Sequence, residues 1–263
     1  MDLKLNDKTA LVTAGTAGIG LEIARKLAVE GAHVIVTGRS QAKLDAASAD
    51  IRASGGTRIR GILADAATAE GSAALLRAQD QVDILVNNLG VYESKSFAEI
   101  TDADWHAYFD LNVLSGVRLA RGYFPKMLEQ NWGRIIFISS ESALTIPGDM
   151  IHYATTKTAQ LSVSRGLANL TRGTNVTVNA VLPGPTRSEG IVDFMRSVVL
   201  EPKASAQQVE AEFFATQRAT SLIQRLAEAE EIASLVAYLA SPLSAATNGA
   251  AMRAEGGLIT TIA

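Results

Sequence analysis

The residues with the clearest chemical potential lie between Ser140 and Lys157, a stretch that ends in Tyr153-x-x-x-Lys157. If this end is helical, the tyrosine and the lysine lie one turn apart on the same face. A nearby ammonium favours phenolate over phenol and draws a tyrosine pKa of ~10 towards working pH. Such a tyrosine suits general acid and base catalysis. Ser140, arriving from a preceding strand, could hydrogen-bond the same substrate oxygen, such as that of a carbonyl.

The Tyr153 and Lys157 pair is weak evidence by itself. The chain contains five tyrosines, so one such pair also arises by chance, and a solvated helix surface is the alternative. The interpretation depends on whether the rest of the chain supplies a cofactor site and brings Ser140 to the same place.

The composition is that of a globular protein, with 48% hydrophobic and 19% charged residues in a chain of 263. A formal net charge of −3 gives no support for nucleic acid or an anionic membrane as a partner. The absence of cysteine excludes disulfides and thiolate metal sites. Because His33, His106 and His152 are scattered, we expect no metal.

We expect a soluble, cytoplasmic protein. The first residues, MDLKLNDKTALVT, carry charges where a signal peptide needs an apolar core. No uninterrupted apolar run in the sequence approaches the ~20 residues of a membrane span.

Short apolar segments alternate with amphipathic ones along the whole chain. Strands are predicted at 9–13, 33–39, a segment ending at 65, 82–86, 134–140, 175–184 and 250–254. Helices are predicted at 21–31, 41–53, a polar stretch after 65, a long segment over 102–131, the Tyr153 region and 230–240. This order predicts an α/β fold, a doubly wound (Rossmann-like) parallel sheet of seven strands with helices on both faces. No repeat or linker divides the sequence, so we expect one domain over residues 1–263.

Residues 186–226 interrupt the alternation with about forty residues between the sixth strand and the last helix. A connection of this length is more often a lid or a binding element than scaffold. We expect it to form a substrate loop.

A glycine-rich turn follows the first strand and contains Gly15, Gly18 and Gly20. Glycine lets the backbone approach a pyrophosphate closely, and the following helix N-terminus offers free N–H groups with a partial positive charge. A tight turn without a ligand is the alternative. The position of the turn inside a strand–helix–strand unit favours a dinucleotide site.

The end of the second strand discriminates between cofactors. An acidic residue there usually meets a free ribose 2′-OH, but the sequence is Thr37-Gly38-Arg39-Ser40. The guanidinium of Arg39 suits a 2′-phosphate by charge and geometry. NADP(H) is therefore favoured over NAD(H), and the alternative is that Arg39 only solvates a loop.

These motifs together resemble the short-chain dehydrogenase/reductase family, in its branch of ~250 residues. The resemblance covers nearly the whole chain, and the order and separations of the motifs match as well as their identities. The matching motifs are TAGTAGIG (13–20), Asp65, NNLG (87–90), Asn112, Ser140, Tyr153-x-x-x-Lys157, PGP (183–185) and EGG (255–257). Ala14 departs from the pattern, because it stands where the family has its first glycine.

The resemblance implies a catalytic set of four residues. Tyr153 would be the general acid and base. Lys157 would lower the pKa of that tyrosine and bind the nicotinamide ribose. Ser140 would orient the substrate oxygen, and Asn112 would hold a water that links Lys157 to solvent. Glu141, directly after the serine, is expected to be solvated in a loop, and the alternative is that it faces the cleft.

The resemblance also implies a cofactor site and an assembly. The dinucleotide would lie against Gly15, Thr16, Gly18, Ile19, Gly20, Arg39, Asp65, Asn87, Gly90, Tyr153, Lys157, Pro183, Gly184 and Thr186. Family members of this layout commonly form homotetramers or homodimers, so a homo-oligomer is expected.

The resulting functional hypothesis is an NADP(H)-dependent oxidoreductase that interconverts a ketone or aldehyde and a secondary alcohol. Reduction of a 3-oxoacyl thioester and oxidation of a sugar or polyol are the alternatives among enzymes. A non-catalytic dinucleotide-binding sensor is the alternative from another class. The complete set of Asn112, Ser140, Tyr153 and Lys157 favours the enzyme, because a sensor needs no acid or base.

Overall fold

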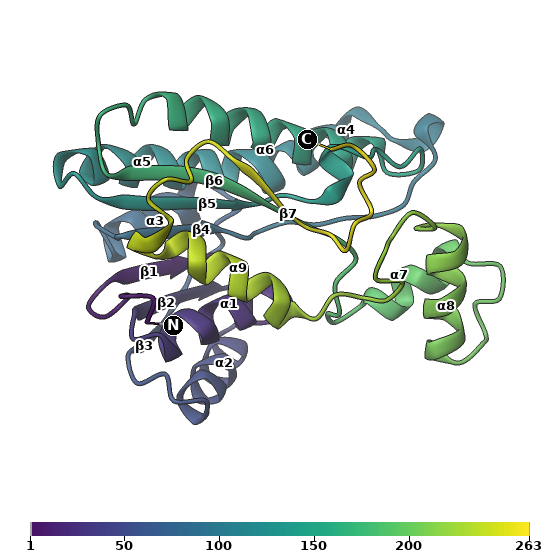
Figure 1. Ribbon diagram of the computed structural model, residues 1–263, viewed down its shortest axis with the longest axis horizontal. Helices are drawn as coiled ribbons and strands as arrows, with labels where there is room; N and C mark the ends of the chain where they lie inside the picture. The colour runs from purple at the N-terminus through teal and green to yellow at the C-terminus, as the bar shows by residue number, and fades with distance from the viewer. Residues whose placement is uncertain (1, 263) are drawn as a thin grey trace.

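The computed structural model describes residues 2–262 and contains one parallel sheet flanked by helices on both faces (Figure 1). Its strands are β1 (Thr9–Val12), β2 (His33–Gly38), β3 (Ile59–Leu63), β4 (Ile84–Asn87), β5 (Gly133–Ile138), β6 (Val176–Pro183) and β7 (Ala251–Ala254). Its α-helices are α1 (Gly18–Val29), α2 (Gln41–Ala53), α3 (Ala69–Ala78), α4 (Asp102–Phe109), α5 (Ser115–Glu129), α6 (Ile151–Asn169), α7 (Ile191–Val198), α8 (Ala206–Thr216) and α9 (Ala229–Ala240). The predicted fold class is confirmed.

The sheet has seven strands in the order β3-β2-β1-β4-β5-β6-β7, and every pairing is parallel. The chain runs outwards from β1 to β3 and then restarts at β4 on the other side of β1. This reversal opens a crevice at the carboxyl ends of β1 and β4, which is where doubly wound sheets bind ligands.

Alternate residues of each strand enter different cores, because successive side chains point to opposite faces of a sheet. In β1, Val12 packs with α1, α2 and α9, whereas Leu11 packs with α3, α5 and α6. Figure 1 shows the same division, with α1, α2 and α9 below the sheet and α5 and α6 above it. The central strands are therefore apolar on both sides, as buried parallel strands are.

The long helix predicted over residues 102–131 is divided into three parts. A π-helical segment, Asp110–Leu114, separates α4 from α5. It contains Asn112, whose backbone oxygen accepts a hydrogen bond from Gln160 Nε2 at 2.5 Å. A single π turn widens the helix locally, and such turns often occur at functional sites. Residue periodicity alone did not reveal it.

The long connection after β6 forms two helices, α7 and α8. They project beyond the end of the sheet at the right of Figure 1 and pack on each other through their own small core. Their buried members include Met195, Phe213 and Phe214. The segment is thus a folded unit beside the crevice. Irregular stretches of chain at its two ends connect it to β6 and α9.

Ala14 adopts a left-handed backbone conformation, with φ at 50°. This conformation costs a residue with a Cβ about 1–2 kcal/mol. Glycine avoids that cost, but it destabilises the folded protein by ~0.4–1 kcal/mol because it increases the conformational entropy of the unfolded chain. We predict that Ala14→Gly raises the free energy of unfolding by roughly 1 kcal/mol, measured as a higher urea midpoint.

The matched control for this substitution is Ala46→Gly, at an exposed position inside α2. There the same change should destabilise the protein by ~1 kcal/mol, because glycine is a poor helix former. A lower midpoint for Ala14→Gly would contradict the assignment of strain to the turn.

Candidate active site

A cavity of about 580 Å³ lies at the carboxyl ends of the strands. Its wall brings together Ser140 at the end of β5, Tyr153 and Lys157 from α6, and the glycine-rich turn before α1. Helices α7 and α8 supply the opposite side. Residues far apart in the sequence therefore meet in one place, as the parallel sheet requires of loops that follow its strands.

Tyr153 and Lys157 lie one helical turn apart in α6, and both side chains are buried. Lys157 Nζ lies 5.7 Å from the centroid of the Tyr153 ring. The same ammonium donates a hydrogen bond of 2.9 Å to the backbone oxygen of Ile138, at the end of β5. This bond ties the helix to the strand that carries Ser140.

Burial changes the acidity of both groups. It lowers the pKa of Lys157 to about 8, with the Glu141 carboxylate acting in the opposite direction. Burial also raises the pKa of Tyr153, the charge of Glu141 adds to this effect, and the Ser140 hydroxyl opposes it. The direction for Tyr153 is opposite to the lowering that the resemblance implied, because desolvation of the phenolate is the largest effect here.

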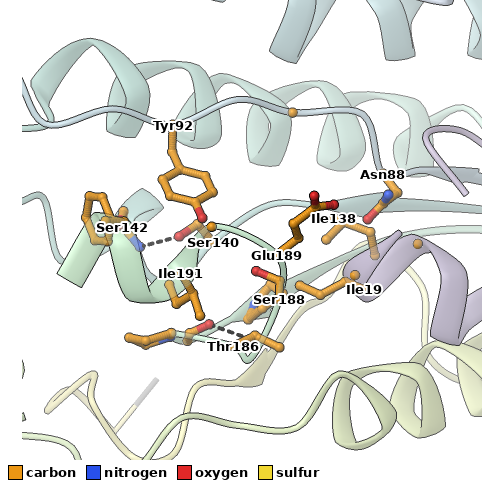
Figure 2. A pocket seen from close by; sticks show the side chains of 18 of the residues that line it. Ile19, Asn88, Tyr92, Ile138, Ser140, Ser142, Thr186, Ser188, Glu189 and Ile191 are labelled. Atoms are coloured by element: carbon orange, nitrogen blue, oxygen red, sulfur yellow. Dashed lines mark hydrogen bonds between the residues drawn. The ribbon is translucent and has the colours of Figure 1, made fainter. Parts of the chain in front are cut away.

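Ser140 is held in an extended conformation at the end of β5, and its hydroxyl has two partners, of which Figure 2 shows Ser142. The Oγ accepts a hydrogen bond of 3.1 Å from the backbone N–H of Ser142. It also donates to a carboxylate oxygen of Glu141. The serine is therefore fixed beside the tyrosine at the base of the cavity.

The expectation that Glu141 is solvated in a loop is wrong. The residue is only 5% exposed, and its Oε1 lies 3.4 Å from Nε of Arg218. Arg218 comes from the segment after α8 and is itself largely buried, above the ring of Phe213. Sequence reasoning missed this pair because its two members belong to distant segments that only the tertiary fold brings together.

Asn112 stands behind the cavity wall and fixes the loop that follows β4. Its Oδ1 accepts a hydrogen bond of 2.9 Å from the backbone N–H of Val91. Its Nδ2 donates to the backbone oxygen of Val91 at 3.1 Å and to Thr156 Oγ1 at 2.9 Å. The amide thus links this loop to α6, and a water held by Asn112 stays a prediction.

The glycine-rich turn packs tightly on itself and on the loop after β4, and it leads into α1. A Cβ on Gly20 would lie 2.5 Å from the backbone oxygen of Ala14 and 2.4 Å from Asn88 Nδ2. Gly18 begins α1 with φ at 51°. No side chain caps this helix N-terminus, and the residues around it line the cavity. Uncapped N–H groups at a helix start fit a pyrophosphate.

The predicted cofactor residues divide into two groups. Those that line the cavity are Thr16, Gly18, Ile19, Gly20, Gly90, Tyr153, Lys157, Pro183, Gly184 and Thr186. Those that stand outside its lining are Gly15, Arg39, Asp65 and Asn87. A Cβ on Gly15 would lie 2.8 Å from a side-chain carbon of Val36, so this glycine is required by the packing of the turn against β2.

Several lining residues were not predicted from the sequence. Lys43, in the first turn of α2, extends the positive charge that Arg39 begins. Because Lys43 lies close to Arg39 in the sequence, it could have been included in the predicted cofactor site. Asn88 belongs to the NNLG motif, and Ser188, Glu189 and Arg218 belong to the segment expected to form a substrate loop, but none of them was singled out, and no motif pointed to Tyr92.

Aromatic rings from the loop after β4 and from the segment 186–226 line part of the cavity. The Tyr92 ring lies 6.2 Å from that of Tyr153 and 5.3 Å from that of Phe194, measured between centroids. Phe213 of α8 lies 6.3 Å from Phe194 of α7. The segment 186–226 therefore contributes directly to the wall of the site.

Within residues 2–262, no cluster of three or more potential metal ligands is present. The part of the chain that the structure describes also has no helix with the length and hydropathy needed to cross a membrane.

Known proteins resemble this chain over its full length. The uncharacterized oxidoreductase YvaG of Bacillus subtilis is 47% identical, and the match covers 100% of both chains. The 3-oxoacyl-[acyl-carrier-protein] reductase FabG of Aquifex aeolicus is 30% identical over 98% of this chain and 100% of its own. Among solved structures, L-sorbose reductase from Gluconobacter frateurii, complexed with NADPH and L-sorbose, superimposes with a TM-score of 0.91 at 30% identity, covering 100% of both chains.

Residues 8–196 match the sequence model of the short chain dehydrogenase family. This match covers most of the sheet, the glycine-rich turn, Ser140 and the Tyr153-x-x-x-Lys157 pair. The protein belongs to the short-chain dehydrogenase/reductase family of oxidoreductases.

Proposed function

We propose that the protein is an NADP(H)-dependent oxidoreductase that interconverts a ketone or aldehyde and a secondary alcohol. The observation that carries this proposal is the meeting of Ser140, Tyr153 and Lys157 with the uncapped N-terminus of α1 in one cavity. A dinucleotide site and a proton-transfer group in the same cavity are the two requirements of carbonyl reduction.

Tyr153 is proposed to give a proton to the carbonyl oxygen in reduction and to take it back in oxidation. Bound NADP(H) supplies or accepts the hydride, so the protein has to manage only the proton. A phenol whose pKa is raised by burial is protonated at neutral pH, which is the form that reduction needs. Ser140, beside it, orients the substrate oxygen.

Lys157 is proposed to return protons to Tyr153. Burial lowers the pKa of the lysine to about 8, so the group exchanges protons close to neutral pH. A path to solvent through a water at Asn112 is part of this proposal.

Two positive side chains support NADP(H) as the cofactor. Arg39 follows β2 and Lys43 begins α2, so both belong to the end of the crevice where an adenosine 2′-phosphate would lie. Lys43 lines the cavity itself. L-sorbose reductase, which has the same fold, was solved in complex with NADPH, and this likeness also favours NADP(H).

Two comparisons favour different substrates within this reaction class. Likeness to an L-sorbose reductase favours a polyhydroxy ketone or its alcohol, and likeness to a FabG protein favours a 3-oxoacyl thioester. Both classes belong in any substrate screen. A homo-oligomer, expected from the family resemblance, stays a prediction.

Tyr153→Phe should lower kcat by about 10²- to 10⁴-fold, because the variant loses its general acid. Binding of NADPH, followed by quenching of its fluorescence, should stay nearly unchanged. The control is Tyr92→Phe, which keeps the neighbouring ring and loses only a hydroxyl, and it should retain most activity. Normal turnover by Tyr153→Phe would refute the proposed mechanism.

Arg39→Asp should lower the preference for NADPH over NADH by on the order of tenfold or more, since a charged hydrogen bond to the 2′-phosphate is lost. The measurement is kcat/KM for each cofactor at a fixed carbonyl concentration. Arg52→Asp makes the same charge change at an exposed position near the other end of α2. An equal shift in both variants, or none in either, would remove Arg39 from the cofactor site.

The lowered pKa of Lys157 has a consequence for stability. Between a pKa of about 8 in the folded protein and its ordinary value of 10.5, the unfolded chain binds more protons than the folded one. The free energy of unfolding therefore rises with pH in this window, and the cost of the buried cation is fully present below it.

We predict that wild-type protein gains stability relative to Lys157→Met from pH 8 to pH 10, measured by urea unfolding without cofactor. Lys203→Met, at an exposed lysine, controls for the substitution itself. If the free energy of unfolding of wild type minus that of Lys157→Met stays constant or falls as the pH rises, the lysine is not held in a costly charged state.

A further inference from the structure

The Ser140 hydroxyl has a single proton, and in this structure that proton is donated in a hydrogen bond to Glu141. The hydroxyl donates to the Glu141 carboxylate and accepts from the N–H of Ser142. A serine hydroxyl has one donor and two acceptor lone pairs. While its proton points to Glu141, Ser140 cannot donate to a carbonyl oxygen.

Glu141 is a strong competitor for that proton because it is a buried carboxylate. It is 5% exposed, and the guanidinium of Arg218 lies 3.4 Å away, so it is paired as an anion. Hydrogen bonds to an ionised acceptor are roughly twice as strong as those between neutral groups. A neutral ketone oxygen by itself therefore competes poorly with Glu141 for the Ser140 proton.

A donor carried by the substrate would change this competition. Glu141 and Arg218 both line the cavity together with Ser140 and Tyr153. The cavity wall also contains the aromatic rings of Tyr92, Phe194 and Phe213. In an α-hydroxy ketone the carbonyl and hydroxyl oxygens on the same side lie about 3 Å apart, one hydrogen-bond length. That spacing matches the Ser140 hydroxyl and its Glu141 partner.

We propose that Glu141 selects carbonyl substrates with a hydroxyl on the carbon next to the carbonyl. The substrate hydroxyl donates a hydrogen bond to the Glu141 carboxylate in place of Ser140. The Ser140 hydroxyl is then free to donate its hydrogen bond to the carbonyl oxygen. Arg218 holds the carboxylate in position from the α8 side. This inference rests on the proposed carbonyl chemistry and names its substrate class.

Three small ketones test the inference with NADPH as reductant. They are 3-hydroxybutan-2-one, which carries the donor, 3-methoxybutan-2-one, which has a similar electron-withdrawing oxygen without a donor, and butan-2-one. Wild type should prefer the hydroxy ketone over the methoxy ketone in kcat/KM by about 10- to 100-fold, since one hydrogen bond to a charged group is at stake.

Glu141→Gln should reduce this preference to within about threefold, because the neutral amide no longer holds the Ser140 proton as an anion does. The double variant Glu141→Leu/Arg218→Leu, which replaces the buried pair with apolar residues, should lose the preference in the same way if the single variant folds poorly. Arg225→Gln removes an exposed ion pair with Glu231 in the same segment, and it should keep the wild-type preference.

The outcomes separate this inference from the proposed function. Turnover of the hydroxy and methoxy ketones at equal kcat/KM by wild type would overturn the inference and leave the oxidoreductase standing. A preference that survives in both Glu141 variants would also overturn it. Absence of turnover with any carbonyl in a broad screen would overturn the proposed function and the inference together.

Discussion

The site depends on a buried cation that is held at the end of a buried strand. Lys157 donates from α6 to the carbonyl of Ile138, the last residue of β5, and the next two residues bring the strand to Ser140. Burial of a charge is costly unless it has partners, so the lysine restrains α6 against β5. That restraint fixes Tyr153 beside Ser140. Packing of the apolar sheet and the placement of the proposed proton-transfer groups are thus parts of one arrangement.

A second buried charge, Glu141, connects this centre to the segment 186–226. It accepts from Ser140, pairs with Arg218 and raises the pKa of Tyr153. The position of α8, which leads to Arg218, therefore affects Ser140 and Tyr153 through the side chain of Glu141. Such a connection allows the segment 186–226 to influence the acidity of Tyr153 through Arg218 and Glu141.

Sequence reasoning succeeded where local rules act. Alternating apolar segments predicted the parallel sheet, and the i, i+4 spacing placed Tyr153 and Lys157 on one face of α6. It failed where a contact joins distant segments, as in the Glu141 and Arg218 pair, or where helix geometry departs from 3.6 residues per turn, as at Asp110–Leu114. It also gave the wrong direction for the pKa of Tyr153, because burial is a tertiary property that residue spacing does not carry.

The central claim is that one cavity holds the dinucleotide and presents the substrate oxygen to Ser140 and Tyr153. A crystal structure with NADP⁺ and a ketone or alcohol ligand tests it most directly. The account predicts the pyrophosphate at the N-terminus of α1 and the substrate oxygen about 2.6–3.2 Å from both hydroxyls. A substrate oxygen that faces away from Tyr153, or a dinucleotide bound elsewhere on the sheet, would contradict it.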